Sequence, residues 1–200
     1  MRIYGLTGGI ASGKSEAARR FEERGIPVLD ADGIGHEAIA PGGAATEEVV
    51  AAFGPDILTD GQVDRAKLGA FVFSDPEARA RLNAIVHPAV QGEVARRCGR
   101  LAEAGERAAI VEAALLAEGG RLEPFLSGLI LVIASREIRL KRLCEKRLLS
   151  REEAIRRLDC QTPPESKLAL ARWVLDNNGS VEDLVGQVDS VAGEILSDGA

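Results

Sequence analysis

The chain has 200 residues and a formal net charge of −6, with 46% hydrophobic and 28% charged residues. These values are ordinary for a globular protein with a sizeable core, and the acidic balance argues against binding to nucleic acid or to a membrane surface. No apolar run approaches the ~20 residues that span a bilayer, no signal-peptide pattern opens the chain, and its three cysteines lack metal-ligand spacing. We therefore expect a cytoplasmic protein.

The first predicted elements are a buried strand over residues 2–7 and a helix over residues 16–24, joined by a glycine-rich loop. The loop matches the phosphate-binding pattern G-x-x-x-x-G-K-[ST] and reads Gly8-Gly9-Ile10-Ala11-Ser12-Gly13-Lys14-Ser15. Its backbone N–H groups are expected to surround nucleotide phosphates, with Lys14 reaching the β- and γ-phosphates and the Ser15 hydroxyl binding Mg²⁺. The positive end of the following helix adds to this anion site. This segment therefore predicts a nucleotide-binding loop.

Further apolar runs alternate with helical segments, which is typical of a parallel sheet with crossover helices. The later strands are predicted at residues 26–29, 108–111, 129–133 and 173–175, and an amphipathic helix at residues 180–196. Residues from about 36 to 106 contain no convincing strand, and we expect an inserted helical lobe there. Loops are expected in this lobe at residues 41–43 and 59–61, and the His87-Pro88 pair is expected to end a helix.

A basic segment at residues 136–157 contains nine of the 25 Lys and Arg residues of the chain against four acidic residues. Arg139, Arg142 and Lys146 share one face of a predicted helix, and a capping-box pattern at Ser150 begins a second helix. Two basic helices near a nucleotide would neutralise the charge of a transferring phosphoryl group. A solvated helical face is the alternative, and the excess of positive charge favours the functional interpretation.

Acidic residues follow several predicted strands, at the edge of the sheet where ligands bind in folds of this type. Asp32 could take or orient the proton of an acceptor hydroxyl group. Capping of the next helix by Asp30 or Asp32 is an equally good interpretation of this segment. Glu112 ends a strand, where it could hold Mg²⁺ directly or through water or simply be a solvated strand end. Both questions stay open at the level of sequence.

Several motifs in this order resemble the dephospho-coenzyme A kinase family over nearly the whole chain. They are the loop segment of residues 5–15, Val28-Leu29-Asp30-Ala31-Asp32 followed by His36-Glu37, Asp64-Arg65, Leu82-Asn83-Ala84-Ile85-Val86-His87-Pro88, Arg157 with Gln161, and Val174-Leu175-Asp176-Asn177 with Gly179. The phosphate loop is common to many kinases, whereas the Asp-Ala-Asp and His-Pro segments are much more specific.

The resemblance implies an α/β fold of the P-loop nucleoside triphosphate hydrolase type, with three layers and a five-stranded parallel sheet. One kinase domain over residues 1–200 would carry a helical substrate lobe at residues 34–107 and a helical lid at residues 138–165. The implied reaction is transfer of the γ-phosphate of ATP to the ribose 3′-hydroxyl of dephospho-coenzyme A. The implied partner is this small-molecule substrate, with no nucleic acid or membrane, for a monomer or small homo-oligomer.

Residue roles follow from the same resemblance. Asp32, Lys14 and Arg142 would be catalytic, Ser15 would bind Mg²⁺, and Asp32, Arg65 and His87 would bind substrate. The residues implied to contact ATP are Gly8, Gly9, Ala11, Ser12, Gly13, Lys14, Ser15, Glu16, Arg142 and Asn177.

The chain departs from the family pattern at two places near these residues. Glu16 stands where Thr or Ser is usual, and residues 112–118 replace a segment that normally reads Asp-x-Pro-Leu-Leu-Phe-Glu. Two alternatives therefore stay open, namely another P-loop small-molecule kinase and an ATP-binding protein with impaired catalysis. A GTP-dependent switch is disfavoured because the chain has no Asn-Lys-x-Asp segment to recognise guanine.

Overall fold

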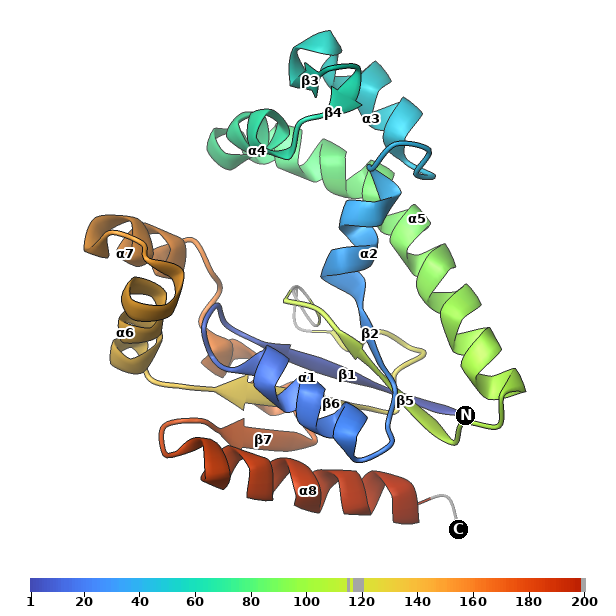
Figure 1. Cartoon of the computed structure of the whole chain (residues 1–200), viewed down its shortest axis with the longest axis vertical. Helices are drawn as coiled ribbons and strands as arrows, with labels where there is room; N and C mark the ends of the chain where they lie inside the picture. The colour runs from blue at the N-terminus through green and yellow to red at the C-terminus, as the bar shows by residue number, and fades with distance from the viewer. Residues whose placement is uncertain (115, 117–120, 199–200) are drawn as a thin grey trace. The chain divides into compact units, whose positions relative to one another are not determined.

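The computed structural model describes residues 1–114, 116 and 121–198 of the chain. The chain forms two compact units, the first made of residues 1–29 and 101–200 and the second of residues 30–100. Figure 1 shows the elements of both units.

The first unit is built on the predicted parallel sheet. Its strands are β1 (Arg2–Gly8), β2 (Val28–Asp30), β5 (Ala108–Glu112), β6 (Gly128–Ile133) and β7 (Trp173–Asp176), in the spatial order β2-β5-β1-β6-β7. Parallel pairing joins β1 to both β5 and β6, and β6 to β7. The α/β fold with a five-stranded parallel sheet is thus confirmed, and each strand overlaps one of the predicted apolar runs.

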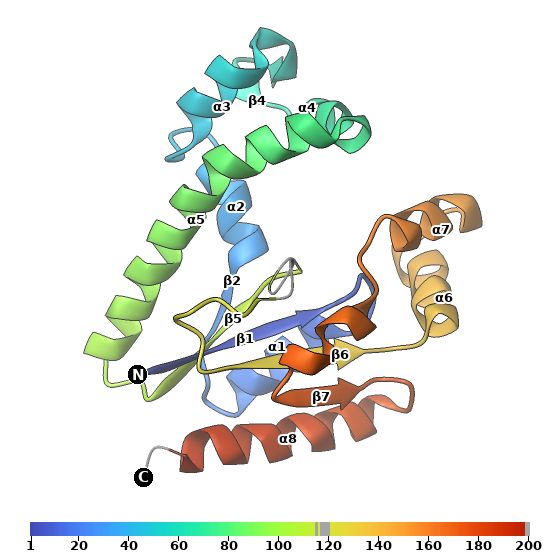
Figure 2. The same ribbon diagram turned by 180° about the vertical axis from the view of Figure 1, so that it is seen from behind.

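Helices α1 (Lys14–Glu23) and α8 (Val181–Ser197) pack together over one face of the sheet (Figure 1). The core between them contains Tyr4 and Leu6 of β1, Phe21 of α1, and Leu184 and Val188 of α8, all fully or almost fully buried. Apolar side chains recur at helical spacing along α8, so burial of one face fixes this helix on the sheet. The 3-10 helix η2 (Pro164–Leu170) lies against β6 on the opposite face (Figure 2).

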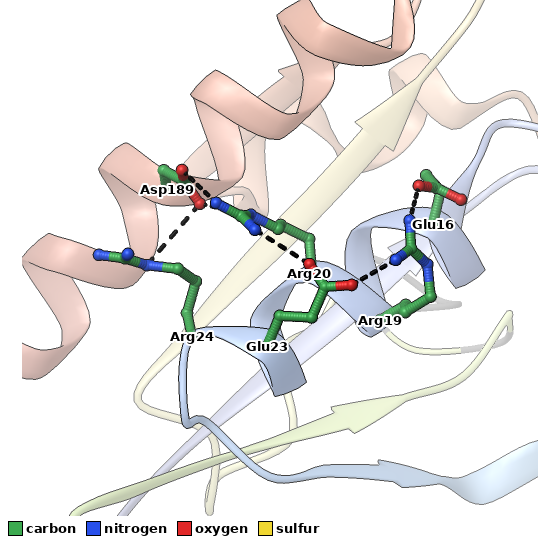
Figure 3. A network of polar contacts seen from close by, with 6 residues as sticks. All are labelled: Glu16, Arg19, Arg20, Glu23, Arg24 and Asp189. Carbon is green, nitrogen blue, oxygen red and sulfur yellow. Dashed lines mark hydrogen bonds and ion pairs between the residues drawn. The ribbon is translucent and has the colours of Figure 1, made fainter.

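A network of ion pairs joins α1 to α8 at the surface (Figure 3). Arg20 donates to Asp189 through Nε at 2.7 Å and Nη2 at 2.6 Å, and Nε of Arg24 lies 3.7 Å from the same carboxylate. Glu23 accepts from Arg20 at 2.9 Å and also pairs with Arg19. The carboxylate of Asp189 therefore holds α8 to the helix that follows the phosphate-binding loop.

We expect an Asp189→Asn variant to be less stable than the wild-type protein at neutral pH and to lose this difference in acid. Hydrogen bonds from Arg20, together with the charges of Arg20 and Arg24, lower the pKa of Asp189 below its usual value of 3.8. A carboxyl group of this kind stabilises the fold above its unfolded-state pKa, and the stabilisation is lost as the pH falls through the lower folded-state pKa.

Thermal unfolding of the two proteins from neutral pH down to about pH 2 tests this expectation. The difference in Tm between the wild-type protein and Asp189→Asn should narrow as the pH falls below the usual pKa of an aspartate. High salt should also narrow this difference at neutral pH, because the Arg20–Asp189 pair is accessible to solvent. A difference in Tm that stays constant over the whole range would contradict the role given to Asp189.

The first unit also contains the two basic helices, α6 (Arg136–Arg147) and α7 (Arg151–Asp159). Ser135 and Ser150 cap them, accepting hydrogen bonds from the backbone N–H groups of Ile138 and Glu153, respectively. Leu148, in the left-handed conformation with φ of 52°, ends α6. Leu143, Ala154 and Leu158 form a small buried cluster between the helices.

The second unit is mostly helical, with one correction to the sequence prediction. Its elements are α2 (Ala31–Ala38), α3 (Thr46–Phe53), η1 (Pro55–Ile57), β3 (Leu58–Thr59), β4 (Gln62–Val63), α4 (Arg65–Ser74) and α5 (Pro76–Glu103), the last of which continues past the unit boundary. The expectation of no strand is wrong, because β3 and β4 pair as an antiparallel hairpin. Asp60 and Gly61 form its turn with positive φ angles of 51° and 76°.

A second correction concerns Pro88, which lies inside α5 and does not end a helix. Proline removes one backbone hydrogen bond and crowds the preceding turn. On both sides of it, however, Ile85, Val86 and Ala89 pack against the same buried cluster of the unit, which includes Val49, Phe53 and Leu68. Burial of this apolar face offsets the cost of the proline, so the helix continues past it. None of the helices in the described part of the chain has the length and apolar character needed to cross a membrane.

Candidate functional site

The phosphate-binding loop connects β1 to α1, which begins at Lys14. Two of its residues adopt positive φ, Ala11 at 59° and Gly13 at 106°. The carbonyl group of Gly13 accepts from the N–H groups of Glu16 and Ala17 at 3.1 Å and so starts the hydrogen-bond ladder of the helix. A loop with left-handed residues at the N-terminus of a helix concentrates N–H groups and positive dipole in one place, which is the arrangement that binds phosphate.

Close packing and backbone conformation favour glycine in this loop, most strictly at Gly8 and Gly13. A Cβ atom on Gly8 would lie 2.5 Å from the carbonyl oxygen of Val132, and one on Gly9 would overlap the guanidinium group of Arg139. At Gly13 it would overlap the side-chain amide of Asn177, in addition to the strain of a positive φ. Gly9 and Gly13 therefore leave room at the loop backbone for the side chains of Arg139 in α6 and of Asn177, the residue after β7.

We expect Gly13→Ala to destabilise the fold by about 2 kcal/mol and to weaken ATP binding, because it displaces Asn177 and strains the loop. Calorimetric titration with a non-hydrolysable ATP analogue and thermal unfolding measure the two effects. Gly186→Ala is the matched control, since an added Cβ on this α8 residue has no atom within 4 Å and alanine favours helix. Unchanged affinity in Gly13→Ala would contradict the close packing described here.

Lys14 and Glu112 form an ion pair beside the loop. The Nζ atom of Lys14 lies 3.3 Å from Oε1 of Glu112, and the two side chains are only 14% and 13% exposed. Glu112 ends β5, which neighbours β1, so the sheet brings its carboxylate to the start of α1. The interpretation of Glu112 as a solvated strand end is therefore wrong. The pair gives the loop a fixed cation next to an acidic group.

Arg142 and Asn177, both predicted as site residues, reach the loop through its carbonyl oxygens. Nη1 of Arg142 donates to the carbonyl groups of Ala11 and Ser12 at 3.3 and 3.2 Å. Its Nη2 donates to both the backbone and side-chain oxygens of Asn177 at 3.1 Å. Asn177 is buried and donates its side-chain amide to the carbonyl group of Ser12 at 2.6 Å. These bonds occupy carbonyl groups of the loop and use none of its backbone N–H groups.

The basic helices also contact the loop. Gln161, which follows α7, accepts the backbone N–H of Ile10 at 2.7 Å. Ile10 and Ala11 pack against the buried cluster between α6 and α7. Of the three cations predicted to share one face of α6, Arg139 is buried beside Gly9 and Arg142 is half-buried at the loop, whereas Lys146 is exposed. In the sequence, Gln161 is indicated only by the family resemblance. No local motif predicts its role, because its partner Ile10 lies 151 positions away.

Ser15 and Glu16 lie in the first turn of α1. Ser15 is exposed, and the carboxylate of Glu16 pairs with Arg19 one turn along the helix (Figure 3). Arg19 also pairs with Glu23, so its single charge offsets only part of the negative charge that distinguishes Glu16 from the Thr or Ser of the family pattern. Of the neighbouring departure at residues 112–118, positions 115, 117 and 118 lie outside the described residues.

In the second unit, the two aspartates at the start of α2 occupy different helix positions. Asp30 is the N-cap and accepts the N–H of Gly33 at 2.9 Å, whereas Asp32 lies within the first turn. The capping role thus belongs to Asp30. Nε2 of His36 lies 2.8 Å from Nη2 of Arg65, which brings the predicted substrate residue Arg65 next to α2. His87 is exposed on α5.

No group of three or more His, Cys, Asp and Glu side chains that could hold a metal ion occurs within residues 1–114, 116 and 121–198. In nucleotide sites, Mg²⁺ is generally held by one or two protein groups together with phosphates and water.

Comparisons with known proteins agree with this geometry. A sequence model of dephospho-CoA kinase matches residues 2–183. The dephospho-CoA kinase of Geobacter sulfurreducens is 43% identical over 192 residues, which cover 96% of this chain and 97% of the relative. A crystal structure from Thermus thermophilus has a TM-score of 0.83 at 38% identity, covering 96% of this chain and 97% of the other. For dephospho-CoA kinase from Campylobacter jejuni the TM-score is 0.62 at 28% identity, with 97% of each chain covered. The chain belongs to the dephospho-CoA kinase family.

Proposed function

We propose that this protein transfers the γ-phosphate of ATP to the ribose 3′-hydroxyl group of dephospho-coenzyme A, which gives coenzyme A and ADP as the last step of coenzyme A synthesis. The observation that carries the proposal is the complete phosphate loop, with Lys14 at the start of α1, in a chain of this family. The acceptor oxygen attacks the γ-phosphorus, the bond to the β–γ bridging oxygen breaks, and the hydroxyl proton leaves to a base.

The loop would bind the phosphates through backbone N–H groups and through Lys14. Its residues Gly8, Gly9, Ala11, Ser12 and Gly13 shape the backbone, and Arg142 and Asn177 hold that backbone from the carbonyl side. Arg139, buried beside Gly9, adds positive charge where the phosphoryl group would pass. Fixed cations of this kind stabilise the charge of the transition state.

The residues present fit a magnesium ion bound together with ATP. The hydroxyl group of Ser15 is exposed in the first turn of α1, and the Glu112 carboxylate lies at the neighbouring strand end. Ser15 would hold the ion, with Glu112 contributing directly or through water. When bound, Mg²⁺ supplies charge neutralisation at the β- and γ-phosphates.

The helical lobe would supply the acceptor side of the reaction. Asp32 is the proposed base, because Asp30 already caps α2 and a carboxylate can accept the hydroxyl proton. Arg65 and His87 are the proposed contacts to the anionic substrate, with His36 hydrogen-bonded to Arg65. In this arrangement residues 34–107 form the substrate lobe and residues 138–165 the lid of one kinase domain. The acidic composition supports an enzyme that binds neither nucleic acid nor membrane. The proposal includes a cytoplasmic location and a monomer or small homo-oligomer.

The test is release of ADP from Mg-ATP with and without dephospho-coenzyme A, combined with mass spectrometry of the product. We expect ADP release that depends on the acceptor, and a product that has gained one phosphate group. Shikimate and adenosine serve as control acceptors, since they carry hydroxyl groups without the pantetheine arm. ADP release at the same rate with every acceptor, or ATP binding without turnover, would contradict the proposal.

A further inference from the structure

Lys167 is a buried lysine at the carboxyl ends of two central strands. It lies in η2, the short helix between α7 and β7, and is only 5% exposed. Its Nζ atom donates to the carbonyl group of Ala114 at 3.0 Å and makes a longer contact of 3.5 Å to Oγ1 of Thr7. A buried ammonium group is costly unless its hydrogen bonds are satisfied in a fixed geometry, so this lysine holds its neighbours in defined places.

The contacts of Lys167 join three segments that are far apart in sequence. Thr7 is fully buried in β1, and its hydroxyl group donates to the carbonyl group of Ala114 at 3.2 Å. Immediately before it, the carbonyl group of Leu6 accepts the N–H of Ala113 at 3.1 Å. The end of β1 and the residues that follow β5 are thus tied together, and Lys167 closes this junction from the side of η2.

Both strand ends at this junction lead directly to the phosphate site. Thr7 precedes Gly8, the first residue of the loop, and Ala114 lies two positions after Glu112, the partner of Lys14. Gln161, six positions before Lys167, holds the N–H of Ile10. Gln161 and Lys167 therefore connect the segment between α7 and β7 to the phosphate loop and to the strand end that carries Glu112.

We propose that Lys167 is a positioning residue for ATP binding and phosphoryl transfer, which acts by fixing the strand end that carries Glu112 and, through the Glu112 carboxylate, the ammonium group of Lys14. This inference rests on the proposed function, since it takes the loop as the site of the ATP phosphates. It adds a residue that acts through others and contacts neither the nucleotide nor the acceptor.

The experiment is a double-mutant cycle on Mg-ATP affinity, measured by calorimetric titration without acceptor. Lys167→Met keeps the length and apolar body of the side chain but removes the ammonium group. We expect it to raise the Kd of Mg-ATP about tenfold. In a Glu112→Gln background, the same substitution should change Kd less than about threefold, because the residue that Lys167 positions has already lost its charge.

Two further variants separate positioning from a general loss of structure. Thr7→Val removes the hydroxyl group of the junction with little change in volume, and we expect a smaller rise in Kd in the same direction. Lys141→Met is the matched control, because this lysine of α6 is 70% exposed, and its Kd should equal that of the wild-type protein. Circular dichroism of each variant establishes that it is folded.

The outcomes distinguish the inference from the proposed function. Wild-type Kd in both Lys167→Met and Thr7→Val would overturn the inference while leaving turnover of dephospho-coenzyme A unaffected. An equal effect of Lys167→Met with and without Glu112→Gln would overturn the route through Glu112, because a merely structural role gives additive effects. If the folded wild-type protein binds no Mg-ATP, the proposed function and the inference both fail.

Discussion

Replacing Lys14 by methionine is expected to lower kcat by about a thousandfold with dephospho-coenzyme A as acceptor. Lys14 is the loop cation that can follow the γ-phosphate, since its long side chain starts at the N-terminus of α1. As the bond to the β–γ bridging oxygen breaks, negative charge moves onto the leaving group, which Lys14 is expected to reach, so loss of the ammonium group should affect kcat more than the affinity for ATP. Acceptor-dependent ADP release at saturating concentrations of both substrates measures the effect.

The Lys14→Met substitution also removes the counter-charge of Glu112, which lies 3.3 Å away. A double variant, Lys14→Met with Glu112→Gln, separates the two consequences, because it removes both charges of the pair. We expect the double variant to be as inactive as the single one. Lys141→Met, which removes an exposed lysine of α6, should retain wild-type kcat. Recovery of activity in the double variant would show that the Glu112 charge, rather than the missing ammonium group, causes the loss.

Local patterns in the sequence were sufficient to predict the sheet and the phosphate loop. The central strands β1, β5 and β6 are short, largely apolar runs that are buried over most of their length, as burial on both faces of a parallel sheet requires. The loop could be predicted because its glycines and Lys14 have fixed spacing and lie between a strand and a helix. These features depend on neighbouring residues, which a sequence displays directly.

Other features depend on contacts between distant residues, and the sequence predictions failed or stayed open there. The strands β3 and β4 have only two residues each, too few to show a period. Pro88 lies inside a helix because the residues on both sides of it pack against the buried cluster of the second unit. Lys167 had no local signal of function, since its partner Thr7 lies 160 positions away. The choice between Asp30 and Asp32 as helix cap was settled by one hydrogen bond, from Gly33 to Asp30.

The residues around the loop show how one fold assigns different tasks to similar side chains. Lys14 faces a carboxylate near the start of α1, whereas Arg142 donates to loop carbonyl groups and Lys167 fixes strand ends. Lys14 is the cation proposed to contact the γ-phosphate, whereas the other two donate to backbone oxygens in this structure. Within residues 136–157, charge alone likewise does not distinguish Arg142 at the loop carbonyl groups from Arg139 beside Gly9. Their positions, rather than their number, decide their roles.

Replacing Asp32 by asparagine is the second substitution for which we expect a large effect, a decrease in kcat of about a hundredfold or more. Asparagine has nearly the same shape as aspartate but accepts no proton from the acceptor hydroxyl group. Because Asp30 caps α2, loss of the Asp32 charge should leave that cap in place. The Kd of Mg-ATP should be unchanged, since the acceptor and not the nucleotide depends on this group.

Asp30→Asn is the matched control, because it removes a charge two positions away while asparagine still caps a helix well. We expect this variant to retain both kcat and Tm. The kinetic constants for dephospho-coenzyme A then identify the role of Asp32. A fall in kcat with little change in KM indicates the proton acceptor, whereas a rise in KM with unchanged kcat would mean that Asp32 only binds substrate. If both constants stay at wild-type values, the base is another group, and the first turn of α2 contributes structure alone.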